Sequence, residues 1–201
     1  MSKLKLLLAT NNQAKLREYS FLFEGMPYLI VSPKDIGIKQ EINETGKTFE
    51  ENAVLKAKAY ASLSNLTTLA DDSGLEVDAL NGEPGVRSAR YAGEGAPQAK
   101  LIEYLLQKLS GIPWGERDAR FKCAIAIASP DGEMITCHGE CQGIITFEPK
   151  GKEGFGYDPV FYLPELDKTM AELTMKEKNK VSHRGKAARK ARRYLELYGQ
   201  E

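Results

Sequence analysis

Two adjacent carboxylates follow an apolar segment in the run Leu69 to Leu75, which reads Leu-Ala-Asp-Asp-Ser-Gly-Leu. Asp71 and Asp72 repel each other when both are ionised, and a divalent cation offsets that repulsion while supplying a Lewis acid and an activated water. Glu44, in a preceding loop, adds a third hard oxygen ligand of the type that Mg²⁺ or Mn²⁺ prefers. The pattern predicts a metal site at a strand end, and the alternative is a solvated acidic surface.

Small polar side chains and a lysine lie close together in the run Thr10 to Lys15. An apolar segment precedes this run and a helical pattern follows it, so backbone amides at the helix start would favour an anion. The run lacks the glycine spacing of a P-loop or a dinucleotide fingerprint. A phosphate site of another kind is one interpretation, and simple helix capping with an exposed Lys15 is the other.

Two aromatic residues surround a glycine in the run Phe155-Gly156-Tyr157-Asp158, within a glycine-rich loop. A planar base could stack on such a surface, although two core aromatics that anchor the loop would give the same pattern. The run Ser182-His183-Arg184-Gly185 supplies donors for a purine edge or a phosphate, or it is the capped start of a surface helix. A metal site, an anion site and a stacking surface together predict a nucleotide ligand.

Charge is balanced overall, with 28 basic and 28 acidic residues, but its distribution is uneven. The stretch from Lys176 to Arg193 contains nine basic residues and one acidic residue. The part of this stretch that follows Gly185 could bind nucleic acid, yet alanines rather than aromatics are interleaved with its charges. We therefore predict a solvated helix face and no nucleic-acid partner.

The composition is that of an ordinary globular chain of 201 residues, for which we expect a single domain over residues 1–201. No apolar run approaches membrane-spanning length, and the run Leu4 to Ala9 is too short for a signal peptide, so we expect a cytoplasmic protein without a membrane partner. The cysteines are odd in number, which argues against a disulfide framework, and their spacing lacks a second pair of zinc ligands. We expect all three to be buried in strands.

Apolar periodicity and capping signals predict the elements that position these residues. A mixed α/β fold with a central sheet is the natural class for their order. The capping box Thr48-Phe49-Glu50-Glu51 opens a helix that runs to about Ser62, with Ala53, Ala57 and Tyr60 facing the core. A second capping box begins at Thr174. The other expected elements are a strand over Lys3–Ala9, a helix from Gln13 capped by Asn11 or Asn12, a strand over Tyr28–Val31, short strands over Thr68–Asp71 and Leu75–Ala79 on either side of an Asp-Asp-Ser-Gly turn, an irregular loop over Asn81–Pro97, a helix over Gln98–Leu109, a hairpin of Arg120–Ala128 and Glu133–Ile145, and a helix over Gly185–Tyr198 stopped by Gly199.

Several blocks, in order, resemble the inosine triphosphate pyrophosphatase family, also called the dITP/XTP pyrophosphatases. The resemblance covers essentially the whole chain. The blocks are Ala9-Thr10-Asn11-Asn12 with Lys15, Glu44-Thr45-Gly46 with Phe49, Glu51-Asn52-Ala53, Lys56-Ala57, Ala70-Asp71-Asp72-Ser73-Gly74-Leu75, Pro84-Gly85, Ser88-Ala89-Arg90-Tyr91, Gly154 to Pro159, and Ala171-Glu172-Leu173 through Lys178 to Ser182-His183-Arg184-Gly185.

The resemblance implies an elongated α/β fold in which a mixed central sheet with helices forms two lobes that flank a substrate cleft, and usually a homodimer. It also implies Mg²⁺-dependent hydrolysis of ITP, dITP and XTP to the monophosphate and pyrophosphate, with Mn²⁺ as a substitute metal. Two other functions remain open, a pyrophosphatase for other modified nucleotides and a non-catalytic module that binds purine nucleotides.

The resemblance also implies roles for individual residues. Asp72 would be the metal-linked general base and Glu44 a metal-site carboxylate. The triphosphate cradle would comprise Thr10, Asn11, Asn12, Gln13, Ala14, Lys15 and Lys56. Ser73 would touch substrate, the base would be held by Phe155, Gly156, Tyr157 and Asp158, and the pocket would be closed by Lys178, His183 and Arg184. Gln13-Ala14 replaces a region that often carries glycine in the family, which puts backbone contacts there in doubt.

Overall fold

The computed structural model of the protein describes residues 4–198, which form two compact units. Unit 1 comprises residues 4–72, 123–139 and 185–198, and unit 2 comprises residues 73–122 and 140–184. A seven-stranded sheet has the order β2-β1-β3-β4-β5-β6-β7. Its strands are β1 (Leu4–Leu8), β2 (Tyr28–Val31), β3 (Thr68–Val77), β4 (Asp118–Ala128), β5 (Met134–Ile145), β6 (Phe161–Leu163) and β7 (Lys168–Thr169).

The sheet is mixed, which confirms the predicted α/β class. β1 pairs in parallel with both β2 and β3, whereas β6 pairs antiparallel with β5 and β7. β4 and β5 are neighbours joined by the tight turn 129–133, as the predicted hairpin requires. That the whole chain is one domain stays a prediction.

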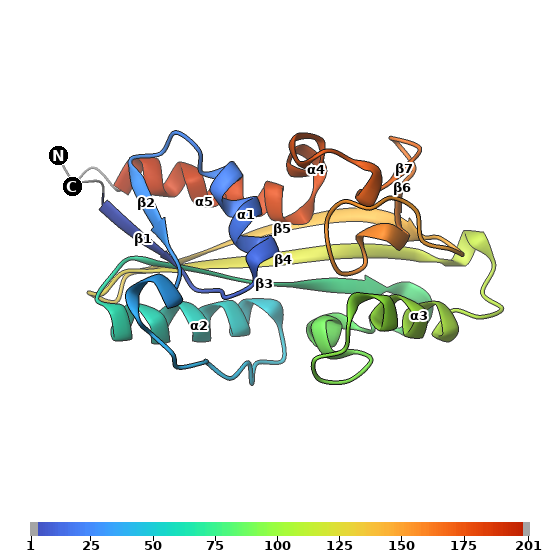
Figure 1. The fold of residues 1–201 in the computed structure, drawn as a ribbon, viewed down its shortest axis with the longest axis horizontal. Coiled ribbons are helices and arrows are strands. Elements are labelled where there is room, and N and C mark those ends of the chain that lie inside the picture. The colour runs from blue at the N-terminus through green and yellow to red at the C-terminus, as the bar shows by residue number, and fades with distance from the viewer. Residues whose placement is uncertain (1–3, 199–201) are drawn as a thin grey trace. The chain divides into compact units, whose positions relative to one another are not determined.

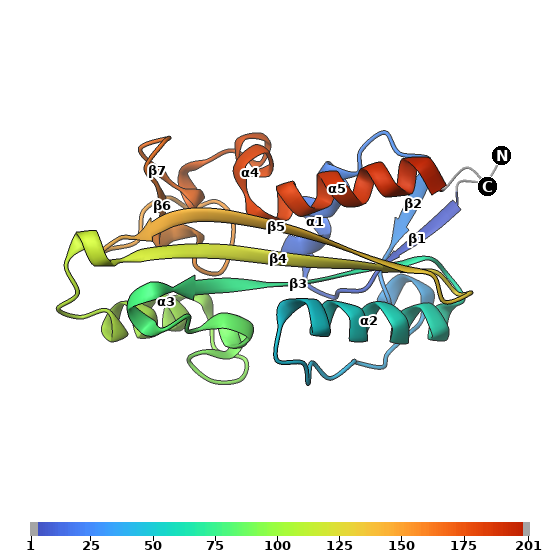
Figure 2. The ribbon, with the colours of Figure 1, turned by 180° about the vertical axis from the view of Figure 1, so that it is seen from behind.

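Unit 1 is built around the parallel strands. In Figures 1 and 2, α1 (Gln13–Leu22) and α5 (His183–Tyr198) lie on one face of its strands and α2 (Phe49–Ser64) lies on the opposite face. The core between these layers is apolar and includes Leu6, Leu8, Tyr19, Leu69 and Ile125. β2 lies on one side of β1 and β3 lies on the other. The order in which strands are added to the sheet therefore reverses at β1. In open α/β sheets such a point is where ligands bind.

Unit 2 holds the antiparallel strands. Its helices are α3 (Gln98–Lys108) and α4 (Met175–Val181), which lie on opposite faces of its strands in Figures 1 and 2. Its core includes Leu75, Leu105, Phe121, Tyr157 and Phe161. Short helical turns complete the two units at Lys34–Ile36, Asp78–Leu80, Gly85–Arg90, Trp114–Glu116, Asp158–Val160 and Met170–Glu172.

The predicted turn at Asp71 to Gly74 is wrong, because β3 runs without interruption from Thr68 to Val77. Gly74 lies within this strand, whereas a glycine of a true turn such as Gly132 has a positive φ. Residues such as Asp and Gly favour turns only when no tertiary contact competes. Here both carboxylates are buried and contacted by other side chains, so the extended backbone is retained.

Most other element predictions are confirmed with shifted ends. α2 ends at Ser64 rather than Ser62, and α5 begins at His183 rather than Gly185. The capping box at Thr174 is complete. At Thr48 only half of it forms, because Glu51 accepts a hydrogen bond from the amide of Lys47 instead of that of Thr48. The predicted end residues Lys3 and Gly199 lie outside the described part of the chain.

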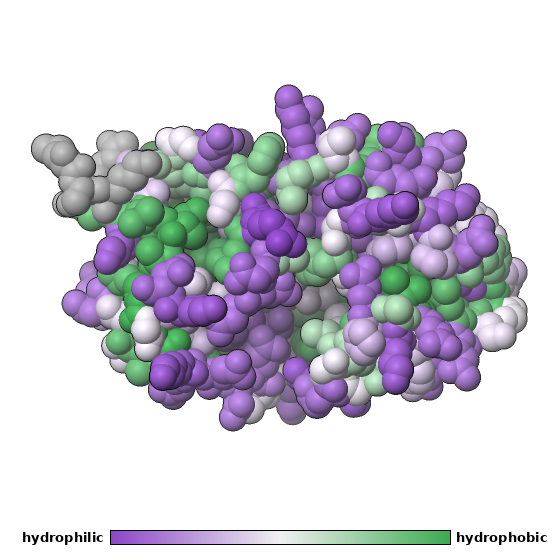
Figure 3. Space-filling view, viewed as in Figure 1, coloured by the Kyte–Doolittle hydropathy of each residue, from purple (hydrophilic) through white to green (hydrophobic). Residues whose placement is uncertain are grey.

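The surface is mostly hydrophilic on the face shown in Figure 3, with smaller hydrophobic patches between the charged groups. β2 is an edge strand of the sheet, and half of the Leu29 side chain on it is exposed. The three cysteines are buried, as predicted, and lie in β4 and β5. Among residues 4–198, no helix combines the length and the hydropathy needed to span a bilayer.

Candidate functional site

Residues at the carboxyl ends of β1 and β3 form the first candidate cluster, in unit 1. Leu8 at the end of β1 pairs with Leu69, so β3 continues past β1 and carries Asp71 and Asp72 beyond the last paired residue. Lys15, in the first turn of α1, lies with its Nζ 2.9 Å from Asp71 Oδ1. The two segments singled out by sequence are thus joined by an ion pair.

Lys56 of α2 connects the acidic residues of this cluster. Its Nζ lies 2.6 Å from Glu44 Oε1 and 3.8 Å from Asp72 Oδ1. It also donates a hydrogen bond to the backbone oxygen of Asp71 at 2.7 Å. The structure therefore brings together Glu44, Lys56 and Asp72.

One stripe of α2 supports this cluster. Asn52, Lys56 and Tyr60 are spaced by four residues, which places them on the same face of the helix, and all three are buried. Asn52 donates to Asp72 Oδ2 at 3.0 Å, and Tyr60 donates to the backbone oxygen of Gln40 at 2.9 Å. Asn52 was not among the predicted site residues. Its spacing from Lys56 is the signal that could have identified it.

Burial and charge act against each other at this cluster. Burial raises the pKa of Asp72, and the nearby Lys56 ammonium opposes the rise without cancelling it. Burial alone would lower the pKa of Lys56, but the carboxylates of Asp72, Asp71 and Glu44 outweigh it, so this pKa is raised. Two lysines face three carboxylates here, which leaves an excess of negative charge. The cluster is thus suited to admitting a further cation.

The donor set limits what kind of metal site this can be. In the part of the chain that the structure describes, no group of three or more His, Cys, Asp or Glu side chains could hold a metal ion. Glu44 and Asp72, joined through Lys56, offer two carboxylates. Mg²⁺ is commonly held by one or two carboxylates together with substrate phosphates and water. The residues fit a metal that two carboxylates hold weakly, with water and phosphate completing its coordination, rather than one caged by protein.

The predicted phosphate segment is divided between two places. Asn12 caps α1, and its Oδ1 accepts hydrogen bonds from the amides of Ala14 and Lys15 at 2.9 and 3.3 Å. Thr10 Oγ1 accepts from the amide of Asn12 at 3.2 Å. An anion at this helix start would therefore share these amides with the cap.

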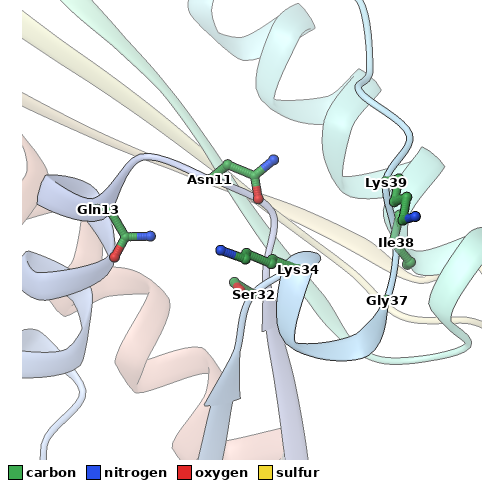
Figure 4. A pocket seen from close by; sticks show the side chains of 7 residues that line it. All are labelled: Asn11, Gln13, Ser32, Lys34, Gly37, Ile38 and Lys39. Carbon is green, nitrogen blue, oxygen red and sulfur yellow. The ribbon is translucent and has the colours of Figure 1, made fainter.

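Asn11 and Gln13 lie elsewhere, in a pocket of about 480 Å³ on unit 1. In Figure 4, Asn11 extends from the β1–α1 loop and Gln13 from the start of α1, and Ser32 and Lys34 lie in the segment that follows β2. The remaining lining residues are Gly37, Ile38 and Lys39. The pocket thus carries two lysines and no carboxylate, at the carboxyl ends of β1 and β2.

A second cluster, in unit 2, surrounds Asp158. The Oδ2 atom of Asp158 lies 2.6 Å from Lys178 Nζ and accepts a hydrogen bond from the amide of Phe155 at 2.8 Å. Both charged side chains are 3% exposed. Gly154 has a φ of +74°, and a Cβ there would overlap the Asp158 carboxylate. This loop conformation requires glycine at position 154 and holds Phe155 in place.

The Phe155 ring is half-buried beside two cations. Lys178 Nζ lies 4.8 Å and Arg184 Cζ lies 5.3 Å from its centroid, within cation–π range. Arg184 is buried and donates from Nη2 to Ser73 Oγ at 2.8 Å. The structure therefore brings together Ser73, Phe155, Lys178 and Arg184 within unit 2.

Two of the three remaining predicted residues, Tyr157 and His183, are anchored in the unit 2 core. His183 stacks on Phe121, with ring centroids 4.7 Å apart. Tyr157 is buried, and its hydroxyl donates a hydrogen bond to the backbone oxygen of Ser88 at 2.9 Å. Tyr157 therefore anchors the loop from the core, which is the second of the two interpretations given for this run. Gly156 lies between Phe155 and Tyr157 with a φ of +63°. Ser88, which sequence reasoning did not single out, also accepts from the amide of Leu75 at 2.9 Å.

The fold and these clusters define an α/β protein with one lysine–carboxylate cluster and one cation–aromatic cluster. The chain belongs to the Ham1 family, whose model matches residues 6–194. It is 50% identical to the dITP/XTP pyrophosphatase of Halalkalibacterium halodurans over 190 residues, covering 94% of this chain and 98% of that protein. It is 49% identical to the dITP/XTP pyrophosphatase of Bacillus subtilis over 190 residues, covering 94% of this chain and 96% of the relative.

Solved structures agree with this assignment. The Ham1 protein of Staphylococcus aureus superposes with a TM-score of 0.86 at 44% identity, covering 98% of this chain and 100% of that one. The HAM1 protein of Coxiella burnetii gives a TM-score of 0.88 at 41% identity, covering 96% of this chain and 99% of the other. The predicted family and fold class are therefore confirmed.

Proposed function

We propose that this chain is a nucleoside triphosphate pyrophosphohydrolase that converts dITP, XTP and ITP to the monophosphate and pyrophosphate, with Mg²⁺ or Mn²⁺. The relatives reported above, at about half identity over nearly full length, support this proposal. The observation that carries it is the contact of Lys56 with Glu44 and Asp72 next to the Lys15–Asp71 pair. Metal-assisted attack on a phosphate needs this combination of carboxylates and ammonium groups.

The unit 1 residues would perform the chemistry. Asp72 would orient the attacking water and accept its proton, because it is the carboxylate fixed from both sides by Asn52 and Lys56. Lys15 and Lys56 would stabilise negative charge on the phosphates and on the departing pyrophosphate. Glu44 and Asp72 would hold the metal ion, which when bound would supply Lewis-acid activation of the phosphate and of water.

The unit 2 residues would select the base. The Phe155 ring offers a stacking face, and Arg184 lies against it as a donor. The 6-oxo group of hypoxanthine or xanthine accepts hydrogen bonds, whereas the 6-amino group of adenine cannot. A buried donor left unpaired by adenine would cost roughly 1–3 kcal/mol of binding free energy.

The function is tested by a panel of nucleoside triphosphates assayed for both pyrophosphate and orthophosphate. We expect pyrophosphate as the first product from dITP, XTP and ITP, and loss of activity with excess chelator, because two carboxylates hold a metal ion too weakly to compete with a chelator. Orthophosphate as the first product, or full activity with chelator, would contradict the proposal. Preference for another modified nucleotide would favour the broader pyrophosphatase, and binding without turnover would favour the non-catalytic module.

Arg184→Ala is expected to narrow the ratio of kcat/KM for ITP over ATP, because Arg184 contacts Ser73 and the Phe155 ring on which the base is proposed to stack. The ratio should fall by roughly tenfold, the effect of one lost donor. Lys186→Ala, which removes an exposed cation from the same helix, is the control. Equal losses for ITP and ATP would instead make Arg184 a phosphate or structural contact.

The quaternary structure and the compartment are further parts of the proposal. We infer a homodimer, as the family resemblance implies, and a location in the cytoplasm, as expected from the sequence. The substrate is proposed to be a purine nucleotide, without nucleic acid or membrane as a partner.

A further inference from the structure

Asn52 uses both ends of its side-chain amide inside the unit 1 cluster. It is fully buried, its Nδ2 donates to Asp72 Oδ2 at 3.0 Å, and its Oδ1 accepts from the amide of Gly46 at 2.7 Å. One end thus contacts β3, and the other contacts the loop that carries Glu44. A carboxamide presents its donor and its acceptor on two separate atoms, so one side chain can donate to Asp72 and accept from Gly46 at the same time.

The loop approaches Asn52 so closely that position 46 has no room for a side chain. A Cβ on Gly46 would lie 2.7 Å from Asn52 Oδ1 and 2.7 Å from Glu51 Cβ. The next residue, Lys47, donates its amide to Glu51 Oε2 at 2.6 Å. The first turn of α2 therefore fixes the loop at two consecutive amides.

These contacts set the positions of both carboxylates that are proposed to hold the metal. Glu44 lies two residues before Gly46 and contacts Lys56 one turn further along α2. Asp72 is contacted at Oδ2 by Asn52, while its Oδ1 is the oxygen nearer Lys56. Rotation of the Asp72 carboxylate out of its plane would break the bond to Asn52, so Asn52 fixes that plane and keeps the other carboxylate oxygen directed toward Lys56.

We propose that Asn52 is a positioning residue, which orients Asp72 and, through Gly46, fixes the loop that carries Glu44, so that the two carboxylates form one metal site. This inference rests on the proposed function. Residues that orient metal ligands without touching the metal typically change metal affinity or activity by about 10- to 100-fold when they are replaced.

The test compares three variants of the full-length protein. Asn52→Leu keeps the side-chain volume and removes both hydrogen bonds. Gly46→Ala leaves Asn52 in place and forces the loop away from it. Thr48→Ala is the matched control, since it removes the Thr48 Oγ1 cap of α2, which accepts from the amide of Glu51, without touching Asp72 or Gly46.

Two quantities are measured for each variant: the Kd of Mn²⁺ alone, from the electron paramagnetic resonance signal of the free ion, and kcat and KM for dITP at saturating Mg²⁺. We expect Asn52→Leu to raise the Mn²⁺ Kd and lower kcat by about 10- to 100-fold each, with KM little changed. Gly46→Ala should shift both quantities in the same direction. Thr48→Ala should lower the melting temperature and leave Mn²⁺ affinity at the wild-type level.

Circular dichroism establishes whether each variant is folded. If Asn52→Leu does not fold, the Mn²⁺ affinity and kcat of Gly46→Ala test the inference instead. Wild-type Mn²⁺ affinity in both Asn52→Leu and Gly46→Ala would overturn the inference, as would equal losses in Thr48→Ala. Absence of saturable Mn²⁺ binding by the wild type would also overturn it. The proposed function is judged separately, by pyrophosphate release from dITP by the wild type, so the two failures are distinguishable.

Discussion

Asp72→Asn is expected to lower kcat for dITP by about 10²- to 10⁴-fold, the range for loss of a general base. The substitution keeps the shape of the side chain, and its amide oxygen can still accept from Asn52 Nδ2. It removes the negative charge that faces Lys56 and the basicity needed to take a proton from water. Steady-state kinetics on dITP, with pyrophosphate as the measured product, gives the comparison.

The fold should tolerate this change. Burial already raises the pKa of Asp72, which means that the neutral form is the less costly one to bury. We therefore expect a melting temperature close to that of the wild type. Asp131→Asn, the same substitution in the exposed turn between β4 and β5, is the control and should keep full activity. Near wild-type turnover by pure Asp72→Asn protein would remove Asp72 from the mechanism.

The sequence predicted the parts of the site that depend on local chemistry. The acidic pair at Asp71–Asp72, the cap at Asn12 and the helix that carries Lys56 all follow from residue types within a few positions of one another. Parallel pairing of β1 and β3 then brings the ends of these segments together. Contacts between Lys15 and Asp71, and between Lys56 and Asp72, were therefore within reach of sequence reasoning.

The contacts that sequence reasoning missed connect distant residues. Asn52 and Asp72 are 20 positions apart, and Tyr157 and Ser88 are 69 apart. No local periodicity encodes such pairs. The continuous β3 shows the same limit, because the turn preference of Asp-Asp-Ser-Gly is overridden by side chains from α1 and α2. Where local preference and tertiary contact disagreed, the residues concerned belong to the candidate site.

Buried cations were the hardest to anticipate. Arg117 is 2% exposed and donates to the backbone oxygens of Leu109, Ile112, Ile145 and Thr146. Its sequence neighbourhood resembles an ordinary polar loop. Lys178 lies in the basic stretch from Lys176 to Arg193, and it is buried against Asp158. The sequence shows the charge of these residues, but it does not show their burial, which determines their role.

Lys178→Met is expected to destabilise the protein by about 3–5 kcal/mol, because it leaves the buried Asp158 carboxylate without its cation. For a chain of this size that loss corresponds to a fall in melting temperature of roughly 6–20 °C. Lys176→Met, on the exposed side of the same helix α4, is the control and should change stability little. Thermal unfolding followed by circular dichroism measures both.

The double variant Asp158→Asn/Lys178→Met separates stability from function. Removing both charges eliminates the uncompensated carboxylate, and an asparagine oxygen can still accept from the amide of Phe155, so most of the lost stability should return. KM for dITP should stay raised in the double variant, because Lys178 is no longer beside the Phe155 ring. If the double variant regained both the wild-type melting temperature and the wild-type KM, Lys178 would be a structural partner of Asp158 and no part of the nucleotide site.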